Sequence, residues 1–224
     1  MTPDHPNLRS YFAEPTIDRS THPIDPWRWI ETAPPTSDLG VAESVFTVGN
    51  GYLGVRGNPE EGRDYTLNGT YVNGLHETWN IQHAEDAYGL ARVGQSIVNA
   101  PDAKTIRIYV DDEPFRISRA DLSYYERSLD FRDGVLRRSI EWRTPAGKRV
   151  LMDFTRLVSL TDRHLGIEEV RIVLPEDSAP VMLSSQIMNR QDGQDEFGSA
   201  TSASRPASPE DVTQATVNTG SDPR

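Results

Sequence analysis

The sequence predicts an all-β chain folded as an antiparallel sandwich. From Val45 onward, short segments alternate apolar and polar residues with a period of two, which is typical of half-buried strands. Turn signals separate these segments about every ten residues, the spacing found in sandwiches and barrels. Nowhere does an apolar period of 3.6 residues persist for about four turns. We therefore expect strands throughout, with at most a short helix over residues 84–91.

Composition and charge exclude several classes of protein. The chain has 224 residues, a formal net charge of −11 and no cysteine. Runs of Lys and Arg never exceed two residues, so the basic footprint of a nucleic-acid-binding protein is missing. Without cysteine there is no disulfide framework and no thiolate metal site, which fits a reducing cytoplasm. The first residues, Met1–Pro6, lack the features of a signal peptide, and no apolar stretch reaches the length of a membrane span. We expect a soluble cytoplasmic protein without cofactor, metal, nucleic-acid or membrane partners.

The chain divides by composition into three parts. Residues 1–26 contain five prolines and little periodicity, and we expect an extended leader there. Residues 27–197 are expected to form the sandwich domain, whose first segment places Trp27 and Trp29 on one face as anchors for the core. Residues 198–224 are small, polar and proline-bearing, which predicts a flexible tail or an interrupted loop.

The strands are expected to follow one another as hairpins. Residues 105–110 alternate Ile and Val with polar positions, residues 111–114 read as a turn, and Phe115 and Ile117 begin the return strand. Farther along, an Asp-Gly pair at 133–134 favours a tight hairpin turn. The remaining predicted strands cover residues 124–131, 135–142, 150–154, 165–174 and 181–188. Their inward apolar positions include Leu136, Ile140, Trp142, Val150, Met152 and Phe154.

A glycine-rich segment imitates a nucleotide-binding motif. Residues 49–54, GNGYLG, match the pattern GxGxxG, which in a dinucleotide site must open a helix that holds the pyrophosphate. Here Gly57, Pro59 and Gly62 follow within a few residues and forbid a stable helix. We interpret the glycines as a strand bend with a close backbone approach, and we expect neither NAD nor ATP to bind.

The polar segment 74–89 is long for a hairpin connection, and long ordered loops often carry function. Its polar candidates are His76 and Glu77, expected near a substrate entrance, and its candidate sugar-stacking aromatics are Trp79 and Tyr88. The alternative is an inert surface loop with ordinary packing of the aromatics.

No catalytic or metal-binding residue follows from these motifs. Residues 76–80, HETWN, begin like a zinc-protease helix, but Asn80 stands where the second histidine is required. His76 and His83 could join Glu85 or Asp86 around a metal, although such residues in a polar loop are more often simply solvated. No serine lies in a nucleophile-elbow context either.

The segment 43–58, ESVFTVGNGYLGVRGN, closely resembles the opening signature of glycoside hydrolase family 65. The likeness continues through residues 69–73, 94–99, 110–115 and 129–136, and it covers most of the chain, from Trp27 to about residue 190. That family contains the maltose, trehalose and kojibiose phosphorylases and some related hydrolases. The resemblance implies a large super-sandwich of the galactose-mutarotase type, incomplete at its C-terminus in this chain.

The resemblance also implies where the chemistry of the parent enzyme lies. In the family the sandwich precedes a helical barrel with the general-acid glutamate and the phosphate pocket. Inverting phosphorolysis needs that acid to protonate the glycosidic oxygen while phosphate attacks the opposite face of the sugar. The long helices of a barrel are absent from this sequence, so no catalytic residue is carried over. A parent phosphorylase would take inorganic phosphate as co-substrate, would bind its disaccharide through the missing catalytic domain, and could be a homodimer.

Two functions are therefore weighed. The first is a non-catalytic N-terminal fragment of a carbohydrate-active enzyme that acts on an α-glucosidic disaccharide. The second is a self-sufficient carbohydrate-binding or scaffold module, for which Trp79, Tyr88 and Tyr125 are the candidate aromatics. The first predicts that several apolar side chains lack partners because these lie after Arg224, which leaves a marginal domain. Those side chains are Val150, Met152, Phe154, Val170, Ile172 and Val181.

Overall fold

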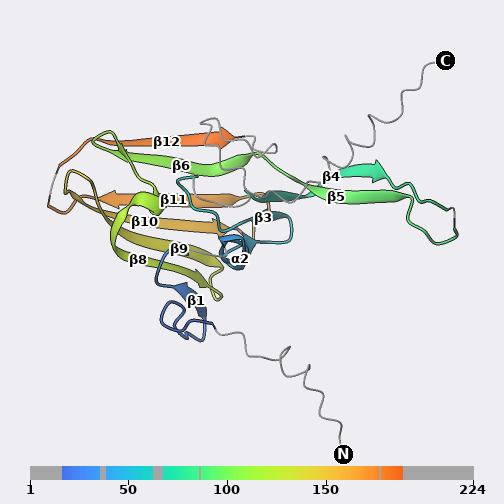
Figure 1. The fold of residues 1–224 in the computed structure, drawn as a ribbon, viewed down its shortest axis with the longest axis horizontal. Helices are drawn as coiled ribbons and strands as arrows, with labels where there is room; N and C mark the ends of the chain where they lie inside the picture. Colours follow the sequence, from blue (N-terminus) through green and yellow to red (C-terminus); the bar gives the residue numbers. More distant parts are fainter. Residues whose placement is uncertain (1–16, 36–38, 63–67, 86, 177, 189–224) are drawn as a thin grey trace, which may run out of the picture. The chain divides into compact units, whose positions relative to one another are not determined.

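The computed structural model describes residues 17–35, 39–62, 68–85, 87–176 and 178–188 (Figure 1). These residues all belong to one compact unit, Met1–Asp192, and they form twelve strands, one α-helix and one 3-10 helix. The predicted all-β class is confirmed. In chain order the elements are β1 (Arg28–Glu31), α2 (Leu39–Val45), β2 (Val48–Gly49), β3 (Leu53–Val55), β4 (Thr70–Asn80), β5 (Val93–Asn99), β6 (Asp102–Val110), β7 (Glu113–Pro114), η1 (Ile117–Arg119), β8 (Asp121–Asp130), β9 (Val135–Arg143), β10 (Arg149–Val158), β11 (Gly166–Val173) and β12 (Val181–Met188).

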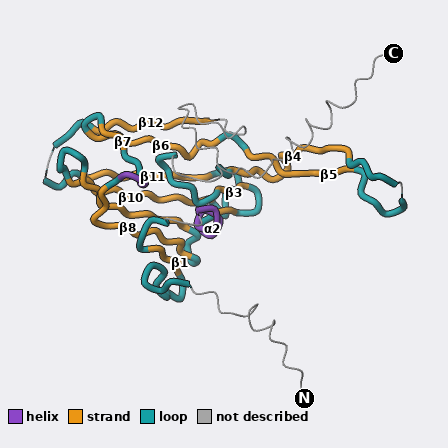
Figure 2. Tube along the Cα trace, in the orientation of Figure 1, coloured by secondary structure: helices purple, strands orange, loops and turns teal. Residues whose placement is uncertain are grey.

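The strands make three antiparallel sheets. A five-stranded sheet has the order β1-β8-β9-β10-β11, a three-stranded sheet has the order β12-β6-β7, and a four-stranded sheet has the order β2-β3-β4-β5. Figures 1 and 2 both show β6 and β12 running along one side of the five-stranded sheet. Strands β8, β9 and β10 follow one another directly, and the turn predicted at residues 133–134 joins the first two.

The first apolar cluster lies between the five-stranded and three-stranded sheets. Ile108 and Val110 of β6 and Phe115 after β7 come from one side. The five-stranded sheet supplies the other side from every second position of β8, β9 and β10, because side chains of a strand alternate between its two faces. Those inner positions are Tyr125, Ile140, Trp142, Val150, Met152 and Phe154, all buried. Two sheets packed face to face are a sandwich, as predicted.

This packing corrects the expectation that several core residues await elements after Arg224. Val150, Met152 and Phe154 are at most 1% exposed, because the side chains from β6 and Phe115 cover them. Val170 and Ile172 are partly buried against the same cluster. Of the six side chains, Val181 alone remains 39% exposed. The described sandwich therefore closes the core of β10 on its own.

The second apolar cluster joins the four-stranded sheet to the other end of the five-stranded sheet. Phe46, Val48 and Val55 meet side chains from β8, β9 and β10, with Trp29 packed partly against them. Trp27 does not share this role. Its indole is 49% exposed and lies under the guanidinium of Arg132, 4.4 Å from the ring centre. Of the two predicted anchors, only Trp29 reaches the core.

The glycine-rich segment forms a hairpin, as the strand-bend interpretation requires. β2 pairs with β3, and Gly51 in the turn has a φ of +85°, a conformation that glycine adopts without strain. The Asn50 side chain accepts hydrogen bonds from the backbone N–H groups of Tyr52 and Leu53 and donates to the Ser159 carbonyl. No helix opens at these glycines, because Gly54 lies inside β3 and the residues from there to Gly62 contain no helix.

Three local predictions were wrong. The helix of the described chain lies at Leu39–Val45, and the described residues of segment 84–91 form turns and bends instead. The strand that returns after β6 is only Glu113–Pro114, and Ile117 begins η1. Segment 74–80 belongs to β4 and is not a loop. None of the helices within the described ranges is long and apolar enough to cross a membrane.

Candidate functional site

The predicted site residues lie on a two-stranded ribbon made by the outer parts of β4 and β5. His76, Glu77 and Trp79 are on β4, and they pair with Ile97, Ser96 and Gly94 of β5. From residue 73 to residue 80 every side chain of β4 is exposed. Tyr88 lies in the connection between the two strands and is fully exposed. The segment therefore projects as paired strands where a loop was predicted.

The ribbon separates the two polar candidates. Directly paired residues of antiparallel strands share a face, so Glu77 and Trp79 lie on one face and His76 lies on the other. No described residue forms a hydrogen bond or an ion pair with the side chains of His76 or Glu77. The Trp79 indole lies flat across Gly94, since a Cβ added there would come within 2.3 Å of it. Trp79 is nevertheless 47% exposed.

The remaining sequence candidates do not form a site. His83 hydrogen-bonds to the Ala91 carbonyl at 2.7 Å and thereby closes the connection between β4 and β5. Tyr125 is buried in the core, where its hydroxyl donates to Glu31 Oε2 at 3.0 Å. Within the described ranges, no group of three or more His and acidic side chains is arranged to hold a metal ion.

A row of charged side chains crosses the interior of the sandwich between the two apolar clusters. We call it the charge belt. Each of the five strands in the large sheet contributes one inward charged side chain. The stretch just before Gly62 adds two more, Glu60 and Glu61. Its members are Glu31, Glu60, Glu61, Arg127, Arg138, Arg156 and Glu168. Register brings them together, because Glu31 pairs with Arg127, Arg127 with Arg138, and Arg156 with Glu168.

Arg138 is the centre of the charge belt. Its guanidinium lies 2.6 Å from Glu60 Oε2 and donates to Glu61 Oε1 at 3.1 Å. Its planar face covers the Phe154 ring at 4.3 Å. Arg138 is 3% exposed, Glu60 3% and Glu61 1%, so water contributes almost nothing to their solvation. Their charges are therefore stabilised by neighbouring charged side chains and not by water.

Arg156 and Arg127 extend the belt on either side. Arg156 Nη2 donates to Glu60 Oε1 at 2.8 Å and to Glu168 Oε1 at 3.0 Å, so two carboxylates share one guanidinium nitrogen. Arg127 lies 2.7 Å from Glu31 Oε2 and donates to the Gly57 carbonyl at 3.1 Å. The belt thus fastens the stretch around Gly57 to the inner face of the large sheet.

The sharing of Arg156 separates the pKa values of its two carboxyl partners. Burial by itself would raise the pKa of Glu60, but the charges of Arg138 and Arg156 outweigh it and hold that pKa below the ordinary value. For Glu168 burial dominates, and the nearby Glu60 charge adds to it, while Arg156 opposes both. Together these effects raise the pKa of Glu168 to about 7. Glu60 therefore keeps its charge, and Glu168 takes up a proton near neutrality.

A cavity of about 490 Å³ opens beside the charge belt. Its walls are mainly apolar, from Pro34, Pro35, Leu39, Ala42, Pro59 and Ile117, and Tyr125, Arg127 and Arg138 line it on the belt side. Both arginines are already bound to carboxylates there. The cavity therefore has an apolar character with no free charge at its floor.

Sequence reasoning missed the charge belt, although one signal for it is present. Alternate residues of a strand point to the same face. Arg138 therefore points inward with the buried apolar residues Leu136, Ile140 and Trp142. Of the two glutamates that neutralise Arg138, the nearer in sequence, Glu61, is 77 residues away from it. No local pattern indicates that contact.

We expect Glu168→Gln to flatten the pH dependence of stability between about pH 5 and 8. In the folded chain Glu168 holds its proton more tightly than in the unfolded chain, whose ordinary value is 4.5. Its contribution to the free energy of unfolding therefore falls as pH rises from 4.5 to about 7. The fall is at most about 3–4 kcal/mol, since the pKa changes from 4.5 to about 7 and a tenfold change in proton affinity is about 1.4 kcal/mol.

Urea unfolding at a series of pH values checks this expectation. Glu169→Gln, the exposed neighbour on β11, is the matched control and should keep the wild-type pH profile. If Glu168→Gln and Glu169→Gln gave the same pH profile, the assignment of the titration to Glu168 would be wrong.

Comparison with known proteins places the chain in a family. The model of the N-terminal domain of glycosyl hydrolase family 65 matches residues 29–220. An uncharacterized glycosyl hydrolase of Mycobacterium tuberculosis (strain ATCC 25618 / H37Rv) is 38% identical over 176 residues, which are 79% of this chain and 22% of that protein. The α,α-trehalose phosphorylase of Thermoanaerobacter brockii is 37% identical over 148 residues, 64% of this chain and 19% of that enzyme.

A solved structure has the same fold over much of the chain. The putative kojibiose phosphorylase from human microbiome superposes with a TM-score of 0.60 at 26% identity, covering 68% of this chain and 20% of that one. The chain spans about a fifth of the length of these relatives. With a family model that matches most of its length, the chain belongs to glycosyl hydrolase family 65, as the N-terminal domain of that family's enzymes.

Proposed function

We propose that this chain is the non-catalytic scaffold domain of an enzyme that phosphorolyses or hydrolyses an α-glucosidic disaccharide. The family supports the substrate class, since two of its similar relatives are named as trehalose and kojibiose phosphorylases. If the enzyme is a phosphorylase, inorganic phosphate is its co-substrate. The disaccharide would be bound by the part of the enzyme that corresponds to the other four fifths of the relatives.

The pairing of the interior carboxylates carries this proposal. Cleavage of a glycosidic bond needs carboxyl groups free to act as acid and base on either side of that bond. In the charge belt, every carboxylate faces a guanidinium at 3.1 Å or less. Glu168 has a pKa in the right range for an acid, but its carboxyl is directed at Arg156 and lines neither of the described cavities. Such carboxylates hold the fold together and are not available to a substrate.

We further propose that the β4–β5 ribbon contacts the remainder of the enzyme near its substrate entrance. A two-stranded ribbon in water is marginal by itself. This one also exposes apolar side chains, at Leu75, Trp79, Val93 and Ile97. A partner on one face would bury Trp79 beside Glu77, and a partner on the other face would bury Val93 and Ile97 beside His76.

The proposal is tested by exchanging domains. This chain replaces the matching region of the Thermoanaerobacter brockii trehalose phosphorylase, and the chimera is assayed with phosphate on trehalose, kojibiose and maltose. We expect a chimera that folds to keep trehalose as its substrate, because a scaffold carries no sugar specificity. A change of preferred disaccharide would show that this domain selects the substrate.

The same chimera tests the ribbon. We expect His76→Ala combined with Glu77→Ala to raise KM by about threefold or more while the melting temperature stays unchanged, as the loss of a binding contact would. Thr78→Ala, the exposed residue next to both, is the control. If the double variant kept the wild-type KM and kcat, the ribbon would not contact the substrate entrance.

The second candidate function is a carbohydrate-binding module, and the Trp79 indole favours it. An indole that lies over Gly94 and is about half exposed is a platform on which a sugar ring could stack. Titration of the chain with maltose decides the matter. Saturable binding that Trp79→Ala abolishes would support the carbohydrate-binding module. If no maltose bound up to about 10 mM, the scaffold role would be the one remaining candidate.

Two further properties are proposed from composition and from the family. The complete lack of cysteine supports a cytoplasmic location. We also propose that the enzyme forms a homodimer, which sedimentation of the longer enzyme would test.

A further inference from the structure

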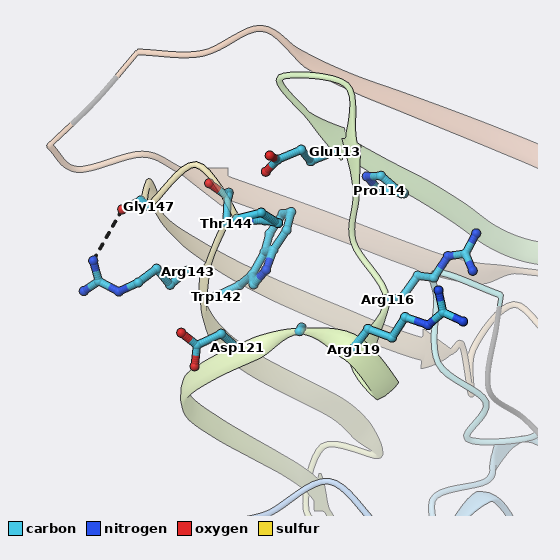
Figure 3. Close-up of a pocket in the computed structure, with 11 residues that line it drawn as sticks. Glu113, Pro114, Arg116, Arg119, Asp121, Trp142, Arg143, Thr144 and Gly147 are labelled. Carbon is cyan, nitrogen blue, oxygen red and sulfur yellow. Dashed lines mark hydrogen bonds between the residues drawn. The ribbon is translucent and has the colours of Figure 1, made fainter.

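A second cavity, of about 570 Å³, lies beside the turn that follows β9 (Figure 3). The carboxylate of Glu113 and the guanidinium groups of Arg116 and Arg119 extend in different directions there. These side chains do not converge on one point, and they form no binding site. A site of covalent modification is found instead on the surface, at the base of the β4–β5 ribbon.

Three asparagines of the chain are followed by a glycine: Asn50, Asn68 and Asn73. The backbone nitrogen after an asparagine can attack the side-chain amide, and glycine favours this attack because it has no Cβ and restricts the backbone least. The attack releases ammonia and closes a five-membered ring, which water then opens to aspartate or isoaspartate. All three pairs belong to the described residues, and their surroundings differ.

The Asn50 amide is held on both sides. Its oxygen accepts hydrogen bonds from the backbone N–H groups of Tyr52 and Leu53, at 3.0 and 2.8 Å. Its nitrogen donates to the carbonyl groups of Ser159 and Arg163, at 2.6 and 3.1 Å. Turning this side chain toward the next backbone nitrogen would break all four hydrogen bonds, so the fold protects Asn50.

Asn68 is protected by burial. It is 5% exposed, and its side-chain oxygen accepts a hydrogen bond from the ammonium group of Lys104. Gly69 is buried as well, and a Cβ added there would collide with the Arg56 side chain. The pair therefore has little room for ring closure and little access to water.

Asn73 has neither protection. It is exposed, and its side chain makes one hydrogen bond among the described residues, from Nδ2 to the Gly51 carbonyl at 3.3 Å, which is longer than usual. Gly74 has a φ of +94°, and nothing lies within 4 Å of a Cβ built on it. The pairing of β4 with β5 skips from Tyr71 to His76, so the Gly74 nitrogen lies outside the ladder of paired strands.

We propose that Asn73 is a site of spontaneous deamidation. The Gly74 nitrogen loses its proton to a hydroxide ion, forms a bond to Asn73 Cγ and displaces Nδ2, which leaves as ammonia. Water then breaks one of the two bonds from the ring nitrogen to a carbonyl carbon. Breaking the bond to Cγ gives aspartate, and breaking the bond to the main-chain carbonyl gives isoaspartate. The reaction needs water alone and does not depend on the proposed function of the domain.

Isoaspartate at this position changes the backbone at the base of the ribbon. Its main chain runs through Cβ and Cγ and is one atom longer than that of asparagine. The change falls between two parts of β4: Thr70–Val72, which pair with β3, and His76–Asn80, which pair with β5. The two parts are thus uncoupled at their junction, and either product adds one negative charge there.

Peptide mapping by mass spectrometry, after ageing of the folded chain in mildly alkaline buffer, tests the proposal. We expect Asn73 to convert to the acid at least about tenfold faster than Asn50 and Asn68, because the hydrogen bonds and packing that hold those two amides must first be lost. The aged chain should also accept methyl groups from protein isoaspartyl methyltransferase, and Asn73→Ser should abolish that signal.

The same chain unfolded in urea is the control. There all three asparagines should convert at similar rates, because each is followed by glycine and the fold no longer separates them. Equal rates in the folded chain, or faster conversion at Asn50 or Asn68, would overturn the proposal. So would an Asn73 that stays an amide in the folded chain while it converts in urea.

Discussion

Replacing Arg138 by glutamine is expected to lower the free energy of unfolding by about 3–5 kcal/mol, because it removes one partner of a buried ion pair and strands the other. Glu60 and Glu61 would stay in the interior with much of their countercharge gone. A whole domain has only about 5–15 kcal/mol of stability, so the variant should be largely unfolded or aggregated at 37 °C.

Arg137 provides a matched control for this prediction. It is the preceding residue on β9, its side chain is exposed, and the same change from arginine to glutamine removes the same charge. We expect Arg137→Gln to stay within about 0.5 kcal/mol of the wild type. The comparison is made by urea unfolding followed by circular dichroism. Equal stability of Arg138→Gln and Arg137→Gln would mean that the charge belt does not hold the sandwich together.

Replacing Gly57 by alanine is expected to cost about 1–3 kcal/mol or more, as overpacking of a closed interior does. An added Cβ would meet the Phe46 Cβ at 2.5 Å and the Phe46 carbonyl oxygen at 2.8 Å. Main-chain atoms cannot swing aside as the end of a flexible side chain can. The backbone around Gly57 is also fixed at both ends, by its N–H bond to the Glu43 carbonyl and by the Arg127 guanidinium on its own carbonyl.

Gly54 serves as the control, since it belongs to the same glycine-rich segment. Nothing lies within 4 Å of a Cβ built there, and its φ is not in the left-handed region. We expect Gly54→Ala to be neutral or slightly stabilising, because alanine narrows the unfolded ensemble. Thermal unfolding of both variants gives the comparison. Similar melting temperatures would contradict the close approach that explains why the segment needs a glycine at position 57.

The strands could be predicted from sequence where one face is buried. Val150, Met152 and Phe154 alternate with polar residues because only one face of β10 meets the first apolar cluster. The outer part of β4 could not be predicted in this way. Both of its faces are exposed to water, so its sequence shows no alternation of apolar and polar residues. Its polar residues therefore predict a loop.

Helix α2 could not be predicted for a related reason. It has seven residues, including a glycine and two valines, and such a segment is not a stable helix in isolation. Long-range contacts hold it: Glu43 pairs with Arg56 at 3.1 Å, and the Arg56 guanidinium also donates to the Gly40 carbonyl. The charge belt escaped prediction in the same way, since strand register and a distant segment assemble it.

The scaffold role is tested most directly by assaying the purified chain itself. The folded chain, checked by circular dichroism, is incubated with trehalose, kojibiose and maltose in the presence of inorganic phosphate, beside the Thermoanaerobacter brockii trehalose phosphorylase as a positive control. We predict that the chain releases neither glucose nor glucose 1-phosphate, because its interior carboxylates are committed to arginines. Phosphate-dependent release of glucose 1-phosphate from any of the three disaccharides would contradict the scaffold role and place catalytic groups within these 224 residues.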